Sequence, residues 1–326
     1  MALTQAQRAV RCNAIMASEI GILAGVSMYK TRPIDVYLEK IGLGQSFESS
    51  VAMEAGQWLE GPIRERCARQ MECELRIPDQ FWPGSVEGTI FHPEYAWIGA
   101  TPDGVLLAGG DPVSLVECKN IGSHGAHHWG ESRDASGVPG QYLCQVMWQM
   151  LVTGIDYACV AVLIGGQDYR IYEVPYDPEL GEMLVEVARR FWFDHVIPLV
   201  PPIEGPTDAR RYIEAKYPKA TRKITPAPLA AGQWARRWIR AERAEKKIAA
   251  IKERAEQELM GLIRDADGIE GPWGKAVWSN QRGKIAWKEA ALAWREAAIA
   301  AGASADDEER FRGQSFRKFD VRMTAE

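Results

Sequence analysis

Apolar and polar positions alternate along several short stretches of the first 200 residues, and between these stretches they recur with helical spacing. Alternation with a period of two predicts strands, and a spacing of three to four predicts helices. The predicted strands are 73–77, 89–92, 98–100, 105–107, 113–119, 157–164 and 169–174, and the predicted helices are 4–24, 33–41, 46–72, 139–153 and 177–197. This order indicates an α/β fold with a mixed central sheet flanked by helices.

Two strand pairs are predicted hairpins. Strands 157–164 and 169–174 flank a Gly-Gly-Gln-Asp turn, which is a strong hairpin signal. Strands 105–107 and 113–117 form the second pair.

In the helix predicted over 46–72, the candidate core positions are Val51, Trp58, Leu59, Ile63 and Cys67.

A proline-rich stretch at 198–206 interrupts the pattern and predicts a domain boundary. We therefore expect a core over 1–200 and a mainly helical extension over 207–326. The extension begins with a long amphipathic helix at 227–264. It continues with a hairpin of 277–278 and 285–287, a helix at 288–300 and a strand at 316–321.

Composition is that of an ordinary soluble globular protein, with 46% hydrophobic and 25% charged residues. We find no apolar run long enough to span a bilayer and no signal-peptide core at the N-terminus, so we expect a cytoplasmic protein. The six cysteines include no Cys-x-x-Cys pair. They are typical of free cytosolic thiols, not of a disulfide framework or an iron–sulfur site.

Charge is distributed unevenly, although the net charge is only −5. Residues 1–206 carry 14 Lys and Arg against 26 Asp and Glu, whereas residues 207–326 carry 25 against 18. An acidic part that binds metal, joined to a basic extension, fits a phosphate-rich polymer as partner. The alternative is a solvated helical tail that happens to be rich in Arg and Lys.

Glu117 and Lys119 carry the chemistry that the pattern points to most directly. They are two residues apart on a predicted strand, so they share one face while Cys118 points to the other. Asp103 lies in the turn before strand 105–107, which we expect beside them. Two carboxylates at this density suit a hard cation such as Mg²⁺, and a neighbouring lysine can position or activate a water. Two carboxylates, a divalent cation and a lysine are the groups that enzymes use to hydrolyse phosphodiesters.

Further candidates come from the surrounding helices. Glu60, with Glu54 and Glu65 as rivals, is placed to reach the metals from the preceding helix. Gln141, Gln145 and Gln149 lie along one face of helix 139–153. They either support the site or form an ordinary polar face, and for Gln149 we favour the ordinary face.

Arg11 and Ser18 lie two helical turns apart and would share a face. An arginine and a hydroxyl suit a terminal phosphate, but the spacing alone favours an exposed arginine and a packing serine. His124, His127 and His128 lie in the loop 120–140. No cysteine or carboxylate spacing supports a zinc site there, so we expect a loop that faces DNA.

These residues sit in longer segments that resemble the YqaJ-type viral recombinase family, which is phage lambda exonuclease-like and part of the PD-(D/E)xK nucleases. The segments are Ala17–Ile20, Leu38–Gly42, Leu59–Pro62, Ile98–Gly104, Val116–Lys119, Trp129–Gly130, Gln145–Gly154, Val162–Gly166 and Phe191–Trp192, with weaker similarity at 277–278, 285–288 and 316–317. Three features depart from the family pattern. Cys118 replaces a β-branched or apolar residue, Met28-Tyr29-Lys30 replaces a Ser-Pro-Trp turn, and the loop 120–140 holds His124, His127 and His128.

The resemblance implies a restriction-endonuclease-like PD-(D/E)xK core and a metal-dependent 5′-to-3′ exonuclease of double-stranded DNA, acting in phage-type homologous recombination. Its cofactor would be Mg²⁺ or Mn²⁺, with two ions. Its partners would be duplex DNA ends and a single-strand annealing protein, in the cytoplasm of a bacterial host that carries the phage or prophage. It also suggests a homotrimer.

Carried over by position, the resemblance assigns three groups of site residues. They are Glu60, Asp103, Glu117 and the Cys118 backbone carbonyl as metal ligands, Lys119 and Gln145 as further catalytic residues, and Arg11 and Ser18 for the 5′ phosphate of DNA. Two other functions stay open. One is a structure- or sequence-specific DNA endonuclease on the same core, and the other is an inactive DNA-binding protein that retains the fold.

Overall fold

The computed structural model describes residues 5–44, 50–219, 224–228, 230–278, 291–292, 294–296 and 300. The chain divides into two compact units, residues 1–217 and 218–326. The division falls after the proline-rich stretch at 198–206 because a further helix, α8, follows that stretch and packs against α3 in the first unit.

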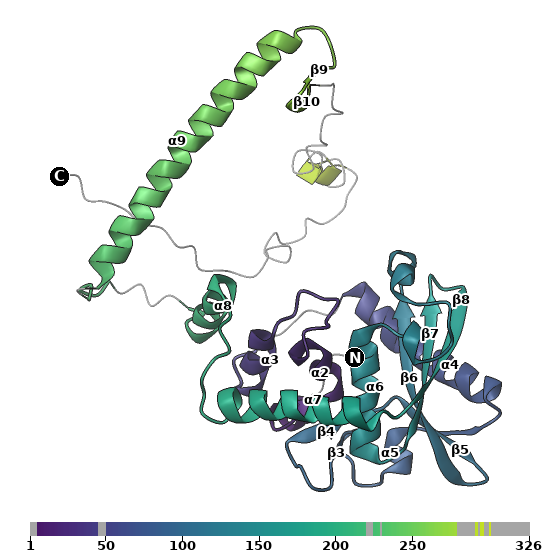
Figure 1. Cartoon of the computed structure of the whole chain (residues 1–326). Coiled ribbons are helices and arrows are strands. Elements are labelled where there is room, and N and C mark those ends of the chain that lie inside the picture. Colours follow the sequence, from purple (N-terminus) through teal and green to yellow (C-terminus); the bar gives the residue numbers. More distant parts are fainter. Residues whose placement is uncertain are drawn as a thin grey trace. The chain divides into compact units, whose positions relative to one another are not determined.

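The first unit alternates helices and strands, as the pattern predicts (Figure 1). Its helices are α1 (Gln5–Cys12), α2 (Ala17–Leu23), α3 (Pro33–Lys40), α4 (Val51–Gln70), α5 (Pro78–Phe81), α6 (Gly140–Thr153), α7 (Pro178–Phe191) and α8 (Pro206–Lys216). Its strands are β1 (Ile15–Met16), β2 (Glu74–Arg76), β3 (Ile90–Phe91), β4 (Ile98–Ala100), β5 (Gly104–Ala108), β6 (Asp111–Ile121), β7 (Tyr157–Ile164) and β8 (Asp168–Pro175).

The main sheet has five strands in the order β2-β5-β6-β7-β8. β6 and β7 are parallel and the other neighbours are antiparallel, so the sheet is mixed as predicted. Both predicted hairpins are confirmed, β5 with β6 and β7 with β8. The pairing of β5 with β6 ends where Gly104 lies opposite Val116. β6 continues beyond that point beside β7 alone, and this free margin positions the site.

Helices α4 and α6 cover opposite faces of the main sheet (Figure 1). Val116 and Cys118 of β6 pack with Ile63 and Cys67 of α4. Leu115 belongs to the larger core, which includes the apolar residues of α6. Because successive side chains of a strand alternate between faces, Glu117 and Lys119 emerge on the α6 side.

The helix predicted over 4–24 is wrong in its middle. The chain leaves the helix after α1 and forms the short strand β1, in which Ile15 pairs with Ile98 in parallel. The Ile15 amide donates to the Trp97 carbonyl at 2.8 Å. β3 completes this second sheet, in the order β1-β4-β3.

The remaining helices of the first unit follow the prediction more closely. α3 begins at Pro33, a position that needs no amide donor. α4 begins after Ser50, whose hydroxyl accepts from the Met53 amide at 3.3 Å. Two of its predicted core positions are wrong, since Val51 and Trp58 are exposed, whereas Ile63 and Cys67 are buried.

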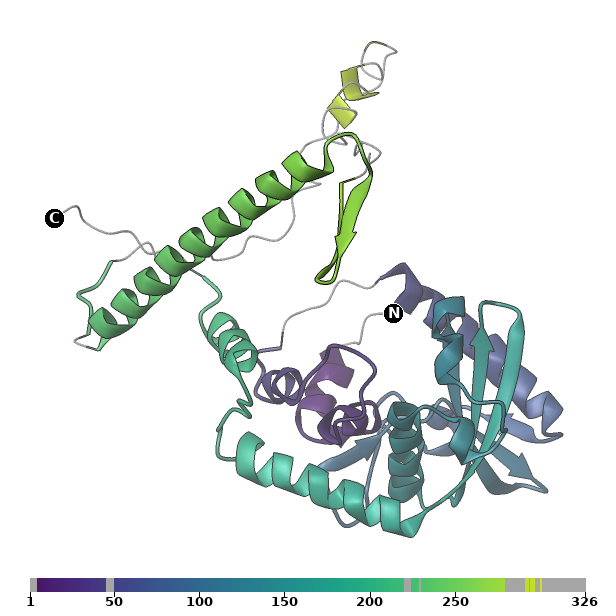
Figure 2. The ribbon, with the colours of Figure 1, turned by 45° about the horizontal axis from the view of Figure 1, so that its top comes forward.

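The second unit contains α9 (Ala231–Ile263) followed by the antiparallel hairpin of β9 (Gly268–Gly271) and β10 (Gly274–Val277), drawn in green (Figure 2). The long helix is thus confirmed. The hairpin differs from the prediction, because Val277 pairs with Gly268. Residues 285–287, most of 288–300, and 316–321 lie outside the described residues. None of the described helices is long and apolar enough to cross a membrane.

Candidate active site

Strand β6 presents Glu117 and Lys119 side by side on the face covered by α6. The Lys119 ammonium donates to Glu117 Oε1. Glu117 is almost fully buried, and the Lys119 side chain is 19% exposed. The two side chains therefore form a nearly enclosed ion pair.

Two glutamines of α6 complete the surroundings of this carboxylate. Gln145 Nε2 donates to Glu117 Oε1 and Gln149 Nε2 donates to Oε2, each at 2.7 Å. The ordinary polar face that we favoured for Gln149 is wrong, because this residue is fully buried and contacts Glu117. Gln141, the third amide of the row, accepts instead from the Met28 amide at 2.9 Å.

Asp103 lies at the point where β5 stops pairing with β6. Its amide donates to the Val116 carbonyl at 3.1 Å, and its Oδ2 accepts from the Cys118 amide at 2.7 Å. The N–H and C=O of one strand residue point to the same side, so the Cys118 carbonyl faces Asp103 as well. Burial, together with the charges of Glu117 and Glu60, raises the pKa of Asp103 well above its usual value.

Glu60 approaches the same group from α4. Burial raises its pKa; Arg64 opposes this shift and Glu117 adds to it. Arg64 Nη1 donates to Glu60 Oε1 at 3.2 Å and also to the Asp103 carbonyl. The rival Glu65 is exposed on the same helix. The described geometry therefore favours Glu60 among the three glutamates considered.

Lys119 is fixed by a tyrosine as well as by carboxylates. Its ammonium lies 4.8 Å from the ring centroid of Tyr142, whose hydroxyl is 2.9 Å from that of Tyr29. Burial lowers the pKa of Lys119, but the Glu117 and Asp103 carboxylates together outweigh it and raise the pKa above its usual value. Lys119 is thus a protonated ammonium at neutral pH, a donor and a positive charge.

The donor chemistry of this cluster fits a divalent metal. Asp103, Glu117 and Glu60 supply hard oxygen ligands. Glu117 contributes to the raised pKa of both Asp103 and Glu60, and Glu60 contributes to that of Asp103. A divalent cation would relieve the repulsion that raises the Asp103 pKa. Within the described ranges, however, no three acidic, histidine or cysteine side chains are grouped closely enough to enclose an ion. In this conformation Glu117 and Glu60 are paired with Lys119 and Arg64.

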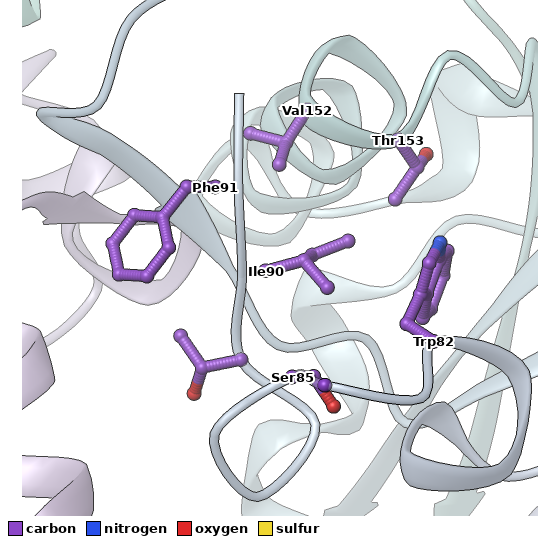
Figure 3. Close-up of a pocket in the computed structure, with 8 residues that line it drawn as sticks. Trp82, Ser85, Ile90, Phe91, Val152 and Thr153 are labelled. Carbon is purple, nitrogen blue, oxygen red and sulfur yellow. The ribbon is translucent and has the colours of Figure 1, made fainter. Parts of the chain in front are cut away.

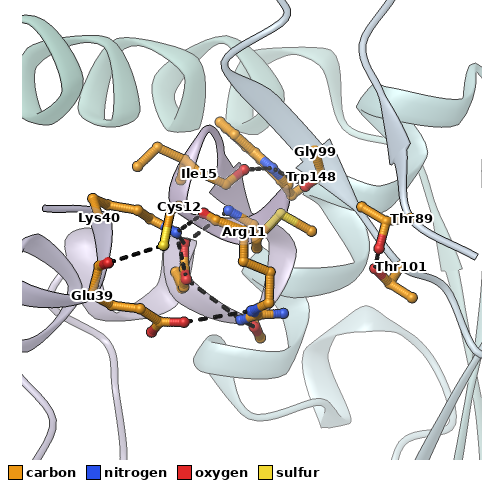
Figure 4. Close-up of polar contacts among 12 residues, drawn as sticks. Arg11, Cys12, Ile15, Glu39, Lys40, Thr89, Gly99, Thr101 and Trp148 are labelled. Atoms are coloured by element: carbon orange, nitrogen blue, oxygen red, sulfur yellow. Dashed lines mark hydrogen bonds and ion pairs between the residues drawn. The ribbon is translucent and has the colours of Figure 1, made fainter. Parts of the chain in front are cut away.

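Arg11 and Ser18 do meet, although α1 and α2 are separate helices. Arg11 Nη2 donates to the Ser18 hydroxyl at 3.1 Å and lies 3.4 Å from Glu19 Oε1. Beneath them the fully buried Lys40 ammonium donates to the Arg11 carbonyl and to Glu19, each at 2.7 Å (Figure 4). The Arg11 guanidinium and the Ser18 hydroxyl are thus in contact with each other, and the buried Lys40 and Glu19 support them.

The histidines of the loop 120–140 and the residues that line a pocket are two further features of the first unit. His127 Nδ1 is 2.8 Å from the His124 carbonyl oxygen, and its ring is 3.9 Å from that of His128. A pocket of about 280 Å³ lies between the end of α6 and the α5–β3 segment (Figure 3). It is lined by Trp82, Gly84, Ser85, Thr89, Ile90, Phe91, Val152 and Thr153, none of which is a predicted site residue.

The chain is similar to a known protein family and to one of its curated relatives. Residues 8–156 match the model of the YqaJ-like viral recombinase domain. The YqaJ protein of Bacillus subtilis (strain 168) is 28% identical over 211 residues, which cover 64% of this chain and 61% of that relative. The chain thus spans less than two thirds of this relative's length.

Two solved structures are also similar. The alkaline exonuclease LHK-Exo from Laribacter hongkongensis is 18% identical with a TM-score of 0.45, covering 66% of this chain and 98% of that one. A phage-related exonuclease from Haemophilus somnus 129PT is 12% identical with a TM-score of 0.41, covering 57% and 96%. The family match thus covers residues 8–156 of the 326, and over this range the chain is similar to the YqaJ-like viral recombinase domain.

Proposed function

We propose that the chain is a divalent-metal-dependent exonuclease that degrades one strand of duplex DNA from a 5′ end during phage-type homologous recombination. The observation that carries the proposal is the meeting of Asp103, Glu117 and Lys119 at the free margin of β6, where Gln145 fixes the Glu117 carboxylate. The similarity of residues 8–156 to the YqaJ-like viral recombinase domain supports it.

The metal would be Mg²⁺ or Mn²⁺, as two ions held by Glu60, Asp103, Glu117 and the Cys118 carbonyl. When bound, the ions would supply an activated water and stabilise the charge of the leaving 3′ oxygen. The carboxylates present the oxygen ligands that such ions prefer.

Lys119 would act as a fixed positive charge. The Glu117 and Asp103 carboxylates outweigh burial and raise its pKa, which favours the protonated ammonium. An ammonium in this position would orient the attacking water and stabilise negative charge on the phosphate in the transition state. Gln145 and Gln149 would keep Glu117 in one orientation throughout.

Arg11 and Ser18 would hold the 5′ phosphate of the DNA end. A guanidinium and a hydroxyl are good phosphate donors, and the contact of Arg11 with Ser18 brings both to one point. We expect Arg11→Ala to remove the preference for 5′-phosphorylated over 5′-hydroxyl ends without abolishing cleavage. Equal digestion of both ends by the wild type would contradict this assignment.

The partners we propose are duplex DNA ends and a single-strand annealing protein, with a homotrimer as the assembly, in the cytoplasm of the bacterial host. The extension over 207–326 would contact DNA or the partner protein, because it carries an excess of basic residues. A truncation after residue 217 would then lower the salt dependence of DNA binding.

The direct test is digestion of 5′-labelled linear duplex with Mg²⁺, with and without a chelator. The wild type should release nucleotides from the 5′ end only with metal, and Lys119→Ala should bind DNA but not cut it. Closed circular duplex serves as the control. Cleavage of the circle would favour an endonuclease, and intact linear DNA at every metal concentration would favour an inactive DNA-binding protein.

A further inference from the structure

Arg64 connects two of the acidic residues of the candidate active site. Its Nη1 donates to Glu60 Oε1 at 3.2 Å and to the main-chain carbonyl of Asp103. Arg64 follows Glu60 by one helical turn on α4, the spacing at which side chains of opposite charge meet. The guanidinium thus lies where the helix comes closest to the start of β5.

This placement depends on a glycine and leaves one donor unused. A Cβ at Gly104 would lie 2.9 Å from Arg64 Cδ, so a larger residue here would require the arginine side chain to shift. Arg64 Nε is buried and has no hydrogen-bond partner within the described part of the chain. The side chain is therefore held mainly through Nη1, on Glu60 and Asp103.

The charges explain what Arg64 does there. Glu117 has Lys119 as its cation, whereas Glu60 has Arg64, whose side chain is only 18% exposed. An arginine stays protonated at every pH at which a protein folds, so this positive charge is permanent. The negative charge of Glu60 is thereby compensated by Arg64 when no metal ion is bound.

Among the described residues, the acidic side chains do not enclose a metal site, and the Glu60 carboxylate is paired with a cation instead. Glu60 Oε1 is engaged along its own helix by Arg64. For Glu60 to bind a metal through Oε1, this ion pair has to open. A guanidinium and a divalent cation would compete for one carboxylate.

We propose that Arg64 is a resident counter-cation that occupies Glu60 until a divalent ion displaces it, and that it thereby lowers the metal affinity of the site. This inference rests on the proposed metal-dependent function and adds to it a residue that regulates metal binding. It assigns to Arg64 no part in the chemical step.

The test measures Mn²⁺ binding to the full-length protein by calorimetry in the absence of DNA. Arg64→Gln should tighten binding roughly tenfold, within the range usual for coupled sites. Arg64→Lys keeps the charge but loses the planar fork that reaches both Glu60 and Asp103, so it should tighten binding less. The matched control is Arg69→Gln, which removes the same charge from the exposed last turn of α4 and should leave the dissociation constant unchanged.

A second readout does not depend on calorimetry. Saturating Mn²⁺ should raise the thermal midpoint more in Arg64→Gln than in the wild type, because tighter binding gives more stabilisation. If Arg64→Gln does not fold, the test relies on Arg64→Lys. An unchanged Mn²⁺ affinity in Arg64→Lys then overturns the inference.

The outcomes separate this inference from the function on which it rests. Equal or weaker Mn²⁺ binding by a folded Arg64→Gln overturns the counter-cation alone. Absence of Mn²⁺ binding by the wild type overturns the metal-dependent function together with it.

Discussion

Gln149 donates a hydrogen bond of 2.7 Å to Oε2 of Glu117, the oxygen opposite the one that Lys119 and Gln145 contact. The Gln149 side chain is fully buried, so this amide is part of the site and not of a polar surface. With both oxygens engaged, the Glu117 carboxylate cannot rotate freely. α6 therefore fixes the orientation of the residue on which the proposed metal site depends.

We expect Gln149→Met to lower both stability and activity. The variant keeps the volume of the side chain but leaves a buried carboxylate oxygen without its donor, which should cost about 1–3 kcal/mol in the free energy of unfolding. DNA cleavage should fall as well, because Glu117 gains freedom. Urea unfolding and a nuclease assay measure the two effects.

Gln141→Met is the control for this prediction. It makes the same change on the same helix, but Gln141 contacts Met28 and Ser27 and not Glu117. Its loss of activity should therefore be the smaller one. If Gln149→Met cleaves DNA like the wild type, Glu117 does not need this second amide.

The ring of Tyr142 makes a second testable contribution. It lies beneath the Lys119 ammonium at 4.8 Å, and a buried cation–π contact is worth about 0.5–2 kcal/mol. Tyr142→Leu removes the ring and should lower the turnover rate roughly 2- to 30-fold, with little change in DNA affinity.

Tyr142→Phe keeps the ring and loses only the hydroxyl contact with Tyr29. It should stay close to wild-type activity. If both variants lose activity equally, the hydroxyl pair and not the ring positions Lys119. Single-turnover cleavage with saturating enzyme distinguishes the two.

Lys40 is predicted to matter for stability more than any surface charge. Its ammonium is fully buried and donates to Glu19 and to the Arg11 carbonyl. Lys40→Met would leave the buried Glu19 with the Met16 amide at 2.9 Å and with Arg11, at 3.4 Å, as its remaining cation, so it should destabilise the fold by about 3–5 kcal/mol. The double variant Lys40→Met with Glu19→Gln removes the uncompensated charge and should recover part of that loss in chemical denaturation. No recovery would mean that the ammonium acts through the Arg11 carbonyl.

Local pattern was sufficient to predict the main sheet and the faces of β6. Alternation placed Glu117 and Lys119 together and Cys118 opposite, because the period of a strand is a property of the backbone. The hairpins followed from turn residues such as Gly165 and Gly166, which adopt positive φ angles.

The errors share one physical cause, which is contact between segments distant in sequence. Ile15 leaves the helical pattern because it pairs with Ile98, and spacing within 4–24 carries no trace of that partner. Gln149 has the sequence context of a polar face, and only the position of Glu117 across the core gives it a role. Arg64 likewise acquires its place from Asp103, 39 positions away.

Asp103→Asn should show how much the buried negative charge of Asp103 lowers the stability of the folded protein. The native-state pKa of Asp103 is raised well above 3.8 by burial and by Glu117 and Glu60. The folded protein then holds this proton more tightly than the unfolded chain, so stability is lost as pH rises from about 4 through the native pKa. Each pKa unit of mismatch is worth ~1.4 kcal/mol.

The asparagine keeps an oxygen for the Cys118 amide but carries no charge. Without metal, Asp103→Asn should therefore unfold at a higher temperature than the wild type at pH 7, with the difference shrinking toward pH 4. Asp111→Asn, at the exposed start of β6, removes an equal charge and should change stability by less than ~0.5 kcal/mol. Added Mg²⁺ should stabilise the wild type and not Asp103→Asn. A variant less stable than the wild type at pH 7 would show that Asp103 is already compensated in the folded protein, and would remove the electrostatic reason for placing a cation beside it.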